Sequence, residues 1–259
     1  MTSFVIKIIA IISMLFDHSS DILIGQTSIL NVLGRIAFPL FAFQLVIGYS
    51  HTSNFKKYFL RLLGFAIISQ IPYSIMSNIV VGSYFYLNIF FTLAFGILAM
   101  YILDFKLEDL YLLFNKFNLS ATKTTSSNNV NHSLNIFLII SKLILISCIL
   151  AIAQFFNFDY QAWGIILILT IYLFYKPSKD IKNNLSFVFI YSLVCITRFI
   201  PYFSTLPLNW LIAEIMFTIL PVIFMILYNG NKGKSLKYFF YLFYPLHLII
   251  LEILHYFFI

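Results

Sequence analysis

Residues 134–156 read LNIFLIISKLILISCILAIAQFF, an apolar run in which Lys142 carries the only charge. A membrane-spanning helix needs about 20 mostly apolar residues, so this stretch is long enough to cross a bilayer. It also lacks the alternation of polar and apolar residues that marks the strands of a membrane β-barrel. The stretch therefore predicts a spanning helix and argues against a barrel.

The whole chain shares this character. Of its 259 residues, 61% are hydrophobic and 10% are charged, and the mean hydropathy is +0.96. Soluble domains average about 45–50% apolar and about 25% charged residues, so a soluble globular domain is excluded. We predict an all-α, polytopic transmembrane bundle of about nine spans that forms one domain, residues 1–259. The nine apolar segments are 4–24, 29–50, 58–76, 84–104, 134–156, 160–176, 183–204, 208–228 and 236–259.

One long connection, residues 105–133, separates the fourth and fifth segments. It is first acidic and amphipathic and then rich in Ser, Thr and Asn. This composition predicts a cytoplasmic connection that begins with an interfacial helix and ends disordered.

The positive charges predict how the chain lies in the membrane. With a cytoplasmic N-terminus, every Lys and Arg falls on the inner side except Arg35, Lys142 and Arg198, which fall within spans. Cytoplasmic loops of membrane proteins carry such an excess. We therefore expect a multi-pass protein with an odd number of spans, its N-terminus in the cytoplasm and its C-terminus outside. The net charge of +7 then reflects topology, and the partner is the lipid bilayer rather than nucleic acid.

Several polar residues fall inside the predicted spans, where a charge at the helix centre costs about 2.5–3.5 kcal/mol on insertion scales and is a functional candidate by default. Counting 1.5 Å per residue along each helix, most of them lie in the outer half and His247 lies near the centre. We predict a polar chamber that opens from the midplane outwards. Its members are Asp17, His18, Arg35, Asn88, Arg198, Glu214, His247 and Glu252.

Asp17, His18 and Asp21 share one face of the first helix by their spacing. A carboxylate that holds one imidazole nitrogen leaves the other free to take a proton, as a general base requires. Alternatively, His18 and Asp21 border the outer interface and are solvated. Arg35 precedes Pro39 and is aimed into the chamber by a kinked helix, engaged in an ion pair with Asp17 or Asp21, or both.

Two further interpretations concern the remaining polar residues. Arg198 is expected to pair with Glu214.

On the inner face, glycine-rich turns with basic residues are typical of phosphate binding, although positive-inside topology alone would also place them there. These candidates are Arg61, Asn229, Gly230, Lys232 and Lys237. Cys148 and Cys195 lack metal-ligand spacing, and we expect no metal.

Five stretches resemble the TraX family of inner-membrane acetyltransferases, named for a protein that acetylates the N-terminus of pilin. The resemblance implies a place in the inner, cytoplasmic membrane. The stretches are KIIAIISMLFDH ending at His18, GRIAFPLFAF from Gly34, KYFLRLLGFAIISQIPY from Lys57, LNIFFTLAFGILAM from Leu87 and KYFFYLFYPLHL from Lys237. The turn at Asn229 and Gly230 also resembles the asparagine-glycine motif of the family. The resemblance implies acetyl-coenzyme A (acetyl-CoA) as acyl donor, used from the cytoplasm.

On this basis the first hypothesis is transfer of an acetyl group to the amine of an exported peptide such as pilin, or to an envelope glycan. His18, oriented by Asp17, would be the general base or acyl carrier. Arg35 and Asn88 would stabilise the oxyanion, Tyr244 and His247 would line the opposite wall, and Asp21 and Arg198 would help to bind substrate. The alternatives are a proton-coupled transporter of a small solute and a non-catalytic envelope assembly factor.

Overall fold

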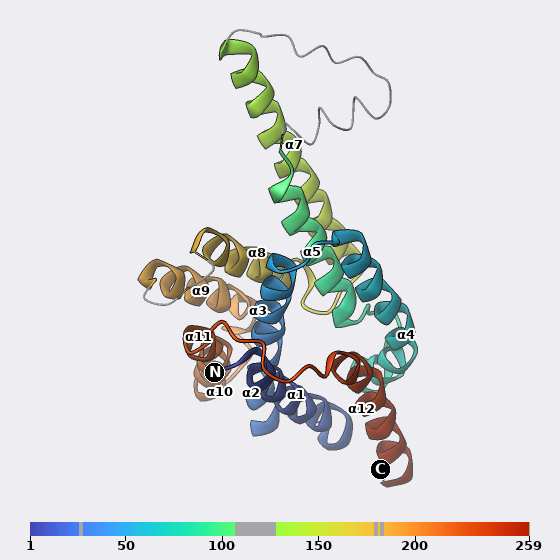
Figure 1. Cartoon of the computed structure of the whole chain (residues 1–259). Coiled ribbons are helices and arrows are strands. Elements are labelled where there is room, and N and C mark those ends of the chain that lie inside the picture. Colours follow the sequence, from blue (N-terminus) through green and yellow to red (C-terminus); the bar gives the residue numbers. More distant parts are fainter. Residues whose placement is uncertain (26–27, 107–127, 179–180, 182–183, 259) are drawn as a thin grey trace.

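The structure, a computed structural model, describes residues 1–25, 28–106, 128–178, 181 and 184–258. Most of these residues are helical (Figure 1). The helices are α1 (Ser3–Ser19) with a π-helical turn (Ser20–Ile24), α2 (Ile29–Gly34), α3 (Ala37–Ser50), α4 (Phe55–Val81), α5 (Ile89–Asp104), α7 (Asn128–Phe155), α8 (Gln161–Ser178), α9 (Leu185–Thr197) with a 3-10 turn (Ile200–Tyr202), α10 (Leu208–Ile219), α11 (Pro221–Ile226) and α12 (Lys237–Phe258).

These helices confirm the predicted all-helical membrane fold. Six helical segments of the described chain are long and apolar enough to cross a membrane, and the apolar helices of α5, α8 and α9 are shorter. The count of nine spans and the orientation of the termini stay predictions. Helix α7 begins at Asn128 rather than at residue 134, and the predicted interfacial helix falls on residues 107–127, outside the described part.

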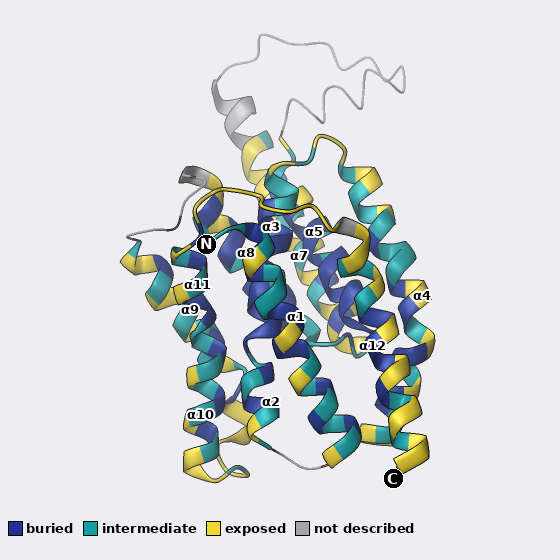
Figure 2. Cartoon of the chain, turned by 60° about the horizontal axis from the view of Figure 1, so that its bottom comes forward, coloured by how far each residue is buried: buried dark blue, intermediate teal, exposed yellow. Residues whose placement is uncertain are grey.

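Helix α3 lies among its neighbours, whereas α7 stands at the edge (Figure 1). Within the span formed by α2 and α3, 67% of the most apolar window is buried, against 11% in α7. Helix α3 packs against α1, α5, α8 and α11, and α4 packs between α5 and α12. On α4, Ile67, Ile71 and Ile75 leave one apolar face exposed (Figure 2), as expected of a surface that contacts lipid.

The second span breaks at Arg35, between α2 and α3. Pro39 has no N–H with which to bond the Arg35 carbonyl, and its ring crowds that carbonyl. Gly34 comes directly before Arg35, and a Cβ added there would come within 2.5 Å of the Asp17 side chain. The absence of a side chain at Gly34 therefore lets α2 approach α1 closely, and the break places Arg35 beside Asp17.

Candidate functional site

Two histidines from opposite ends of the chain meet at the centre of the site. His18 of α1 and His247 of α12 are both buried, and their Nδ1 and Nε2 atoms lie 2.7 Å apart. The two rings are nearly parallel, with an angle of 9° between their planes and centroids 5.0 Å apart. The sequence singled out both residues, and the structure brings them into direct contact.

The hydrogen bonds of His247 define which nitrogen of His18 is available. His247 Nδ1 lies 2.9 Å from the carbonyl oxygen of Phe243, which can only accept, so this nitrogen carries a hydrogen. In a neutral imidazole the Nε2 of His247 is then the acceptor, and His18 Nδ1 donates to it. The Nε2 of His18 consequently keeps its lone pair, and no described residue hydrogen-bonds to it.

The expected orientation of His18 by Asp17 is wrong. Consecutive residues on a helix point about 100° apart, and Asp17 is directed at α2, where its Oδ1 lies 3.7 Å from Arg35 and 3.4 Å from the Asn31 amide. His18 is directed at α12 instead. His247 therefore orients the His18 ring, the role that the sequence had suggested for a carboxylate.

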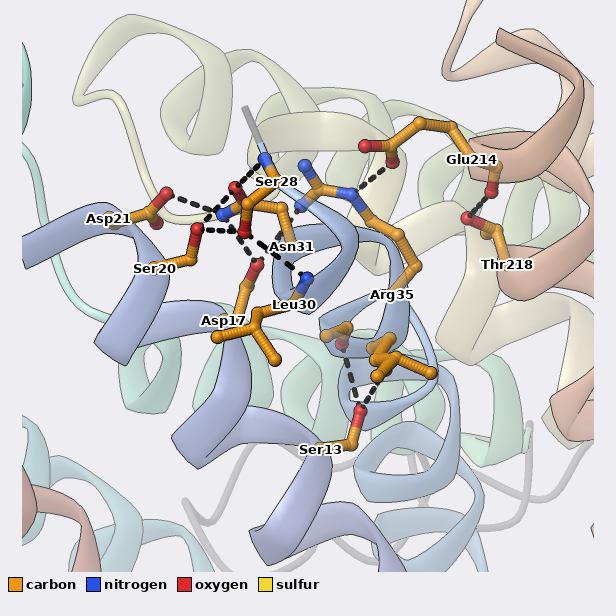
Figure 3. Close-up of polar contacts among 12 residues, drawn as sticks. Ser13, Asp17, Ser20, Asp21, Ser28, Leu30, Asn31, Arg35, Glu214 and Thr218 are labelled. Carbon is orange, nitrogen blue, oxygen red and sulfur yellow. Dashed lines mark hydrogen bonds and ion pairs between the residues drawn. The ribbon is translucent and has the colours of Figure 1, made fainter. Parts of the chain in front are cut away.

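Asp17 and Asp21 belong to a separate polar network at the predicted outer end of α1 (Figure 3). The amide of Asn31 donates to Asp21 at 2.6 Å, and its oxygen accepts from Ser20 at 2.7 Å. Ser28 caps α2 in a reciprocal arrangement with Asn31. This network joins the end of α1 to the start of α2 and holds the Asp21 side chain.

Arg35 has an aspartate beside it, as expected, and a second acidic partner, whereas Arg198 does not form its expected pair. Arg35 pairs with the buried Glu214 of α10 and lies beside Asp17 (Figure 3), so the interpretation of Arg35 as an ion-pairing residue is confirmed. The expected pair between Arg198 and Glu214 is not formed. The Arg198 guanidinium instead lies 4.4 Å from the ring centroid of Tyr160, a cation–π arrangement.

Asn88 cannot act as a free oxyanion donor, contrary to expectation. Its amide donates to the carbonyl of Ala66 at 2.7 Å and to Gln70 at 2.8 Å. Its oxygen accepts from the backbone of Phe90 as the cap of α5. A residue at a helix start is often a cap, and here the side-chain oxygen of Asn88 forms the cap while both amide hydrogens are engaged by α4.

Tyr244 lies next to the histidine pair and has an unoccupied hydroxyl. Its ring meets His18 and His247 edge-on, with centroids 6.2 and 5.6 Å away. The residue is 3% exposed, and within the described chain its O–H meets no acceptor, although the backbone N–H of Ile89 lies near the oxygen. A buried O–H without an acceptor is unusual, so this hydrogen is available to a ligand.

A cavity of about 430 Å³ adjoins Tyr244 and extends to the predicted cytoplasmic face. Its polar lining contains four cationic side chains and no carboxylate among the described residues. It is lined by Lys7, Met14, Phe41, Gln44, Leu45, Gly48, His51, Thr52, Tyr58, Arg61, Leu62, Ile89, Phe90, Leu93, Lys232, Lys234, Ser235, Leu236, Phe240, Tyr241 and Tyr244. A pocket of this volume that is largely apolar with a few polar groups is typical of small-ligand sites.

The basic rim of this cavity is assembled by the start of the chain. Ser3 and Phe4 donate from their backbones to the carbonyls of Asn231 and Lys232, at 2.9 and 3.1 Å. The N-terminal amine donates to the carbonyl of Leu227. These bonds clamp the segment after α11 onto the start of α1, which brings Lys232 and Lys234 to the same cavity as Lys7.

The predicted phosphate-binding residues divide into three groups. Arg61 and Lys232 line the cavity. Asn229 and Gly230 do not, because they form the turn: the Asn229 side chain accepts from the Asn231 backbone, and Gly230 has a φ of 80°. Lys237 is the first residue of α12, and its side chain lies outside the described part.

The sequence missed several lining residues, including Lys7, Gln44, Tyr58 and Tyr241. Topology alone accounted for Lys7, and isolated Gln or Tyr residues in a sequence with 17 Tyr carry no signal. The structure gives Tyr58 and Tyr241 a role. Their rings lie 4.9 and 5.5 Å from the Arg61 guanidinium, and the Tyr241 hydroxyl accepts from Arg61 Nε at 3.1 Å.

The comparisons with known proteins agree with the resemblance seen in the sequence. A probable fimbrial assembly protein FimC, serogroup H1, from Dichelobacter nodosus is 28% identical, and the similarity covers 96% of this chain and 94% of that protein. No solved structure shows a significant match. The family described as TraX protein matches residues 3–255. This match covers nearly the whole chain, which therefore belongs to the TraX family.

Proposed function

We propose that this protein transfers an acetyl group from acetyl-CoA, taken from the cytoplasm, to an amine of an exported peptide of the pilin class. One observation carries the proposal: a cavity with a cationic rim extends to Tyr244, which contacts the histidine pair. The rim suits the phosphates of the donor, because lysine and arginine side chains are the usual partners of phosphate groups.

The length of the path favours a donor with a long arm. Lys7 and His18 are eleven residues apart on α1, which corresponds to about 16 Å along the helix axis. A phosphate held at Lys7 and an acyl group near His18 must be joined by a linker of that order. A small acyl phosphate cannot bridge this separation, whereas coenzyme A carries its thioester at the end of an extended arm.

The free Nε2 of His18 is suited to general base catalysis. As the acceptor nitrogen forms its bond to the acyl carbon, the carbon–sulfur bond breaks. The proton lost by the nitrogen passes to His18 Nε2 and then to the leaving thiolate. The hydroxyl of Tyr244 would donate to the oxyanion, in the role that the sequence had suggested for Asn88.

The acceptor is proposed from the relatives rather than from the cavity. The FimC protein is named for fimbrial assembly, which favours the terminal amine of a pilus subunit over a glycan hydroxyl. The network of Asp17, Asp21, Arg35 and Glu214 lies at the opposite, predicted outer end of α1. There it would position the acceptor, and it would not contact the donor.

Acetyl transfer by the purified protein tests the proposal. We expect radiolabelled acetyl-CoA to label a pilin-type peptide with a free N-terminus, but not the same peptide with a blocked N-terminus. The variant His18→Gln should lose at least 100-fold in rate, the usual contribution of a general base. His255→Gln is the matched control, because His255 bonds the carbonyl of Ile22 away from the cavity.

A folded His18→Gln protein with the rate of the wild type would exclude this mechanism. If the wild type transfers no acetyl group to any peptide or glycan fraction, the enzyme assignment fails. A non-catalytic role in fimbrial assembly would then be the better explanation of the relatives.

A further inference from the structure

Gln44 of α3 is a buried side chain with one end of its amide unused. It is 8% exposed and lines the cavity. Its Oε1 accepts from the hydroxyl of Ser3 at 2.5 Å, and its amide nitrogen is the free end. Within the described chain the Nε2 of Gln44 has no hydrogen-bond partner.

A buried N–H group without a partner is destabilising and uncommon in folded proteins. Its position on the wall of a cavity therefore indicates an acceptor atom on a bound ligand. Charged groups of a ligand already have partners in the cations of the rim. These cations are Lys7, Arg61, Lys232 and Lys234. The same cavity is also lined by apolar side chains, among them Leu45, which follows Gln44 on α3, and Leu62. A neutral amide donor is best matched by a neutral carbonyl.

We propose that Gln44 Nε2 donates a hydrogen bond to an amide carbonyl in the linker of the acyl donor. The cavity thereby selects acyl groups carried on an amide-containing arm, as in coenzyme A, over ligands that offer phosphates alone. This inference rests on the proposed function and names the part of the donor that is recognised. Ser3 is a positioning residue, since it acts only by orienting the Gln44 amide.

Binding measurements can separate recognition of the arm from recognition of the phosphates. Calorimetric titration in detergent would compare coenzyme A with 3′-phosphoadenosine 5′-diphosphate, which has the phosphates but no arm. The variant Gln44→Met would be made in a Ser3→Ala background and compared with Ser3→Ala alone, so that no serine hydroxyl is left unpaired. We expect Gln44→Met to raise the Kd of coenzyme A about tenfold, the effect of one lost hydrogen bond, and to leave the Kd of the nucleotide unchanged.

Lys232→Gln provides the matched comparison, because it should weaken both ligands alike. If Gln44→Met weakens both ligands to the same extent, Gln44 recognises a phosphate and the inference is wrong. It is equally wrong if Gln44→Met leaves the binding of coenzyme A unchanged. Gln44→Leu, checked by circular dichroism and gel filtration, replaces Gln44→Met should the latter not fold.

The transfer assay distinguishes a failure of this inference from a failure of the proposed function. A wild-type protein that transfers acetyl and binds coenzyme A, with a Gln44 variant that binds it equally well, overturns only the inference. A wild-type protein that neither binds coenzyme A nor transfers acetyl overturns both.

Discussion

At the scale of single residues, the position of one hydrogen on His18 depends on His247. His247 Nε2 accepts from His18 Nδ1 because its own Nδ1 faces the Phe243 carbonyl. Loss of this acceptor frees the His18 ring to rotate or to change tautomer. We predict that His247→Ala lowers the acetyl transfer rate about 100-fold, whereas His247→Gln retains more activity, because the Gln oxygen can accept the same bond.

Steady-state kinetics would check this prediction. A positioning role predicts a fall in kcat with little change in the KM for acetyl-CoA. Equal activity of the Ala and Gln variants would show that the acceptor at position 247 is irrelevant.

Asp159, in the turn between α7 and α8, gives a prediction on pH. Burial raises the pKa of Asp159 to about 7, although Arg198 and the backbone N–H of Tyr160 oppose the shift. The folded protein thus holds this proton more tightly than the unfolded chain. The resulting stabilisation is complete below the ordinary pKa of about 3.9 and is lost as the pH rises through 7.

The variant Asp159→Asn cannot ionise, so it should escape this loss. Thermal unfolding at several pH values should give Asp159→Asn a higher Tm than the wild type at pH 8. The difference should shrink towards pH 5. A difference that is independent of pH would mean that Asp159 does not titrate in this range.

At the scale of the helices, the contact of α1 with α2 depends on Gly34. An added Cβ there would lie 2.4 Å from Asp17 Cβ, so Gly34→Ala must push the two helices apart and displace Arg35. We predict a loss of about 1–3 kcal/mol in stability, as for other overpacked sites, together with a lower transfer rate. Thermal unfolding and the transfer assay would measure the two effects.

Gly64→Ala is the matched control for this substitution. Gly64 lies within α4, and a Cβ there would meet nothing within 4 Å. Alanine is favoured over glycine inside a helix, so this variant should be at least as stable as the wild type. If Gly34→Ala and Gly64→Ala changed stability equally, the close packing of α1 against α2 would not be the reason for the effect at Gly34.

The helices were predictable from the sequence, but their side-chain partners were not. Apolar runs and their breaks depend on local sequence, and so does the interruption of the second span at Arg35, before Pro39. The partner of His18 is 229 residues away. Adjacency in sequence favoured Asp17, whereas the helix directs these two side chains to different neighbours. Contacts between helices depend on packing that one sequence does not reveal.

At the scale of the whole molecule, the start of the chain and the segment after α11 must lie on the same side of the membrane. Backbone bonds join Ser3 to Asn231 and Phe4 to Lys232. This pairing holds whichever way the protein is inserted. The proposed function needs that side to be the cytoplasm, where acetyl-CoA is available, and the distribution of positive charges independently predicts the same orientation.

Labelling of single cysteines in intact spheroplasts would decide the orientation. Cys148 and Cys195 are first replaced by Ser, and Lys234→Cys or Phe258→Cys is then introduced. Lys234 lines the rim, and Phe258 ends α12 and is exposed. We predict that a membrane-impermeant maleimide reaches Cys at position 258 in intact cells and reaches position 234 only after lysis. Labelling of position 234 from outside would place the cationic cavity away from the cytoplasm, and acetyl-CoA could not then be its ligand.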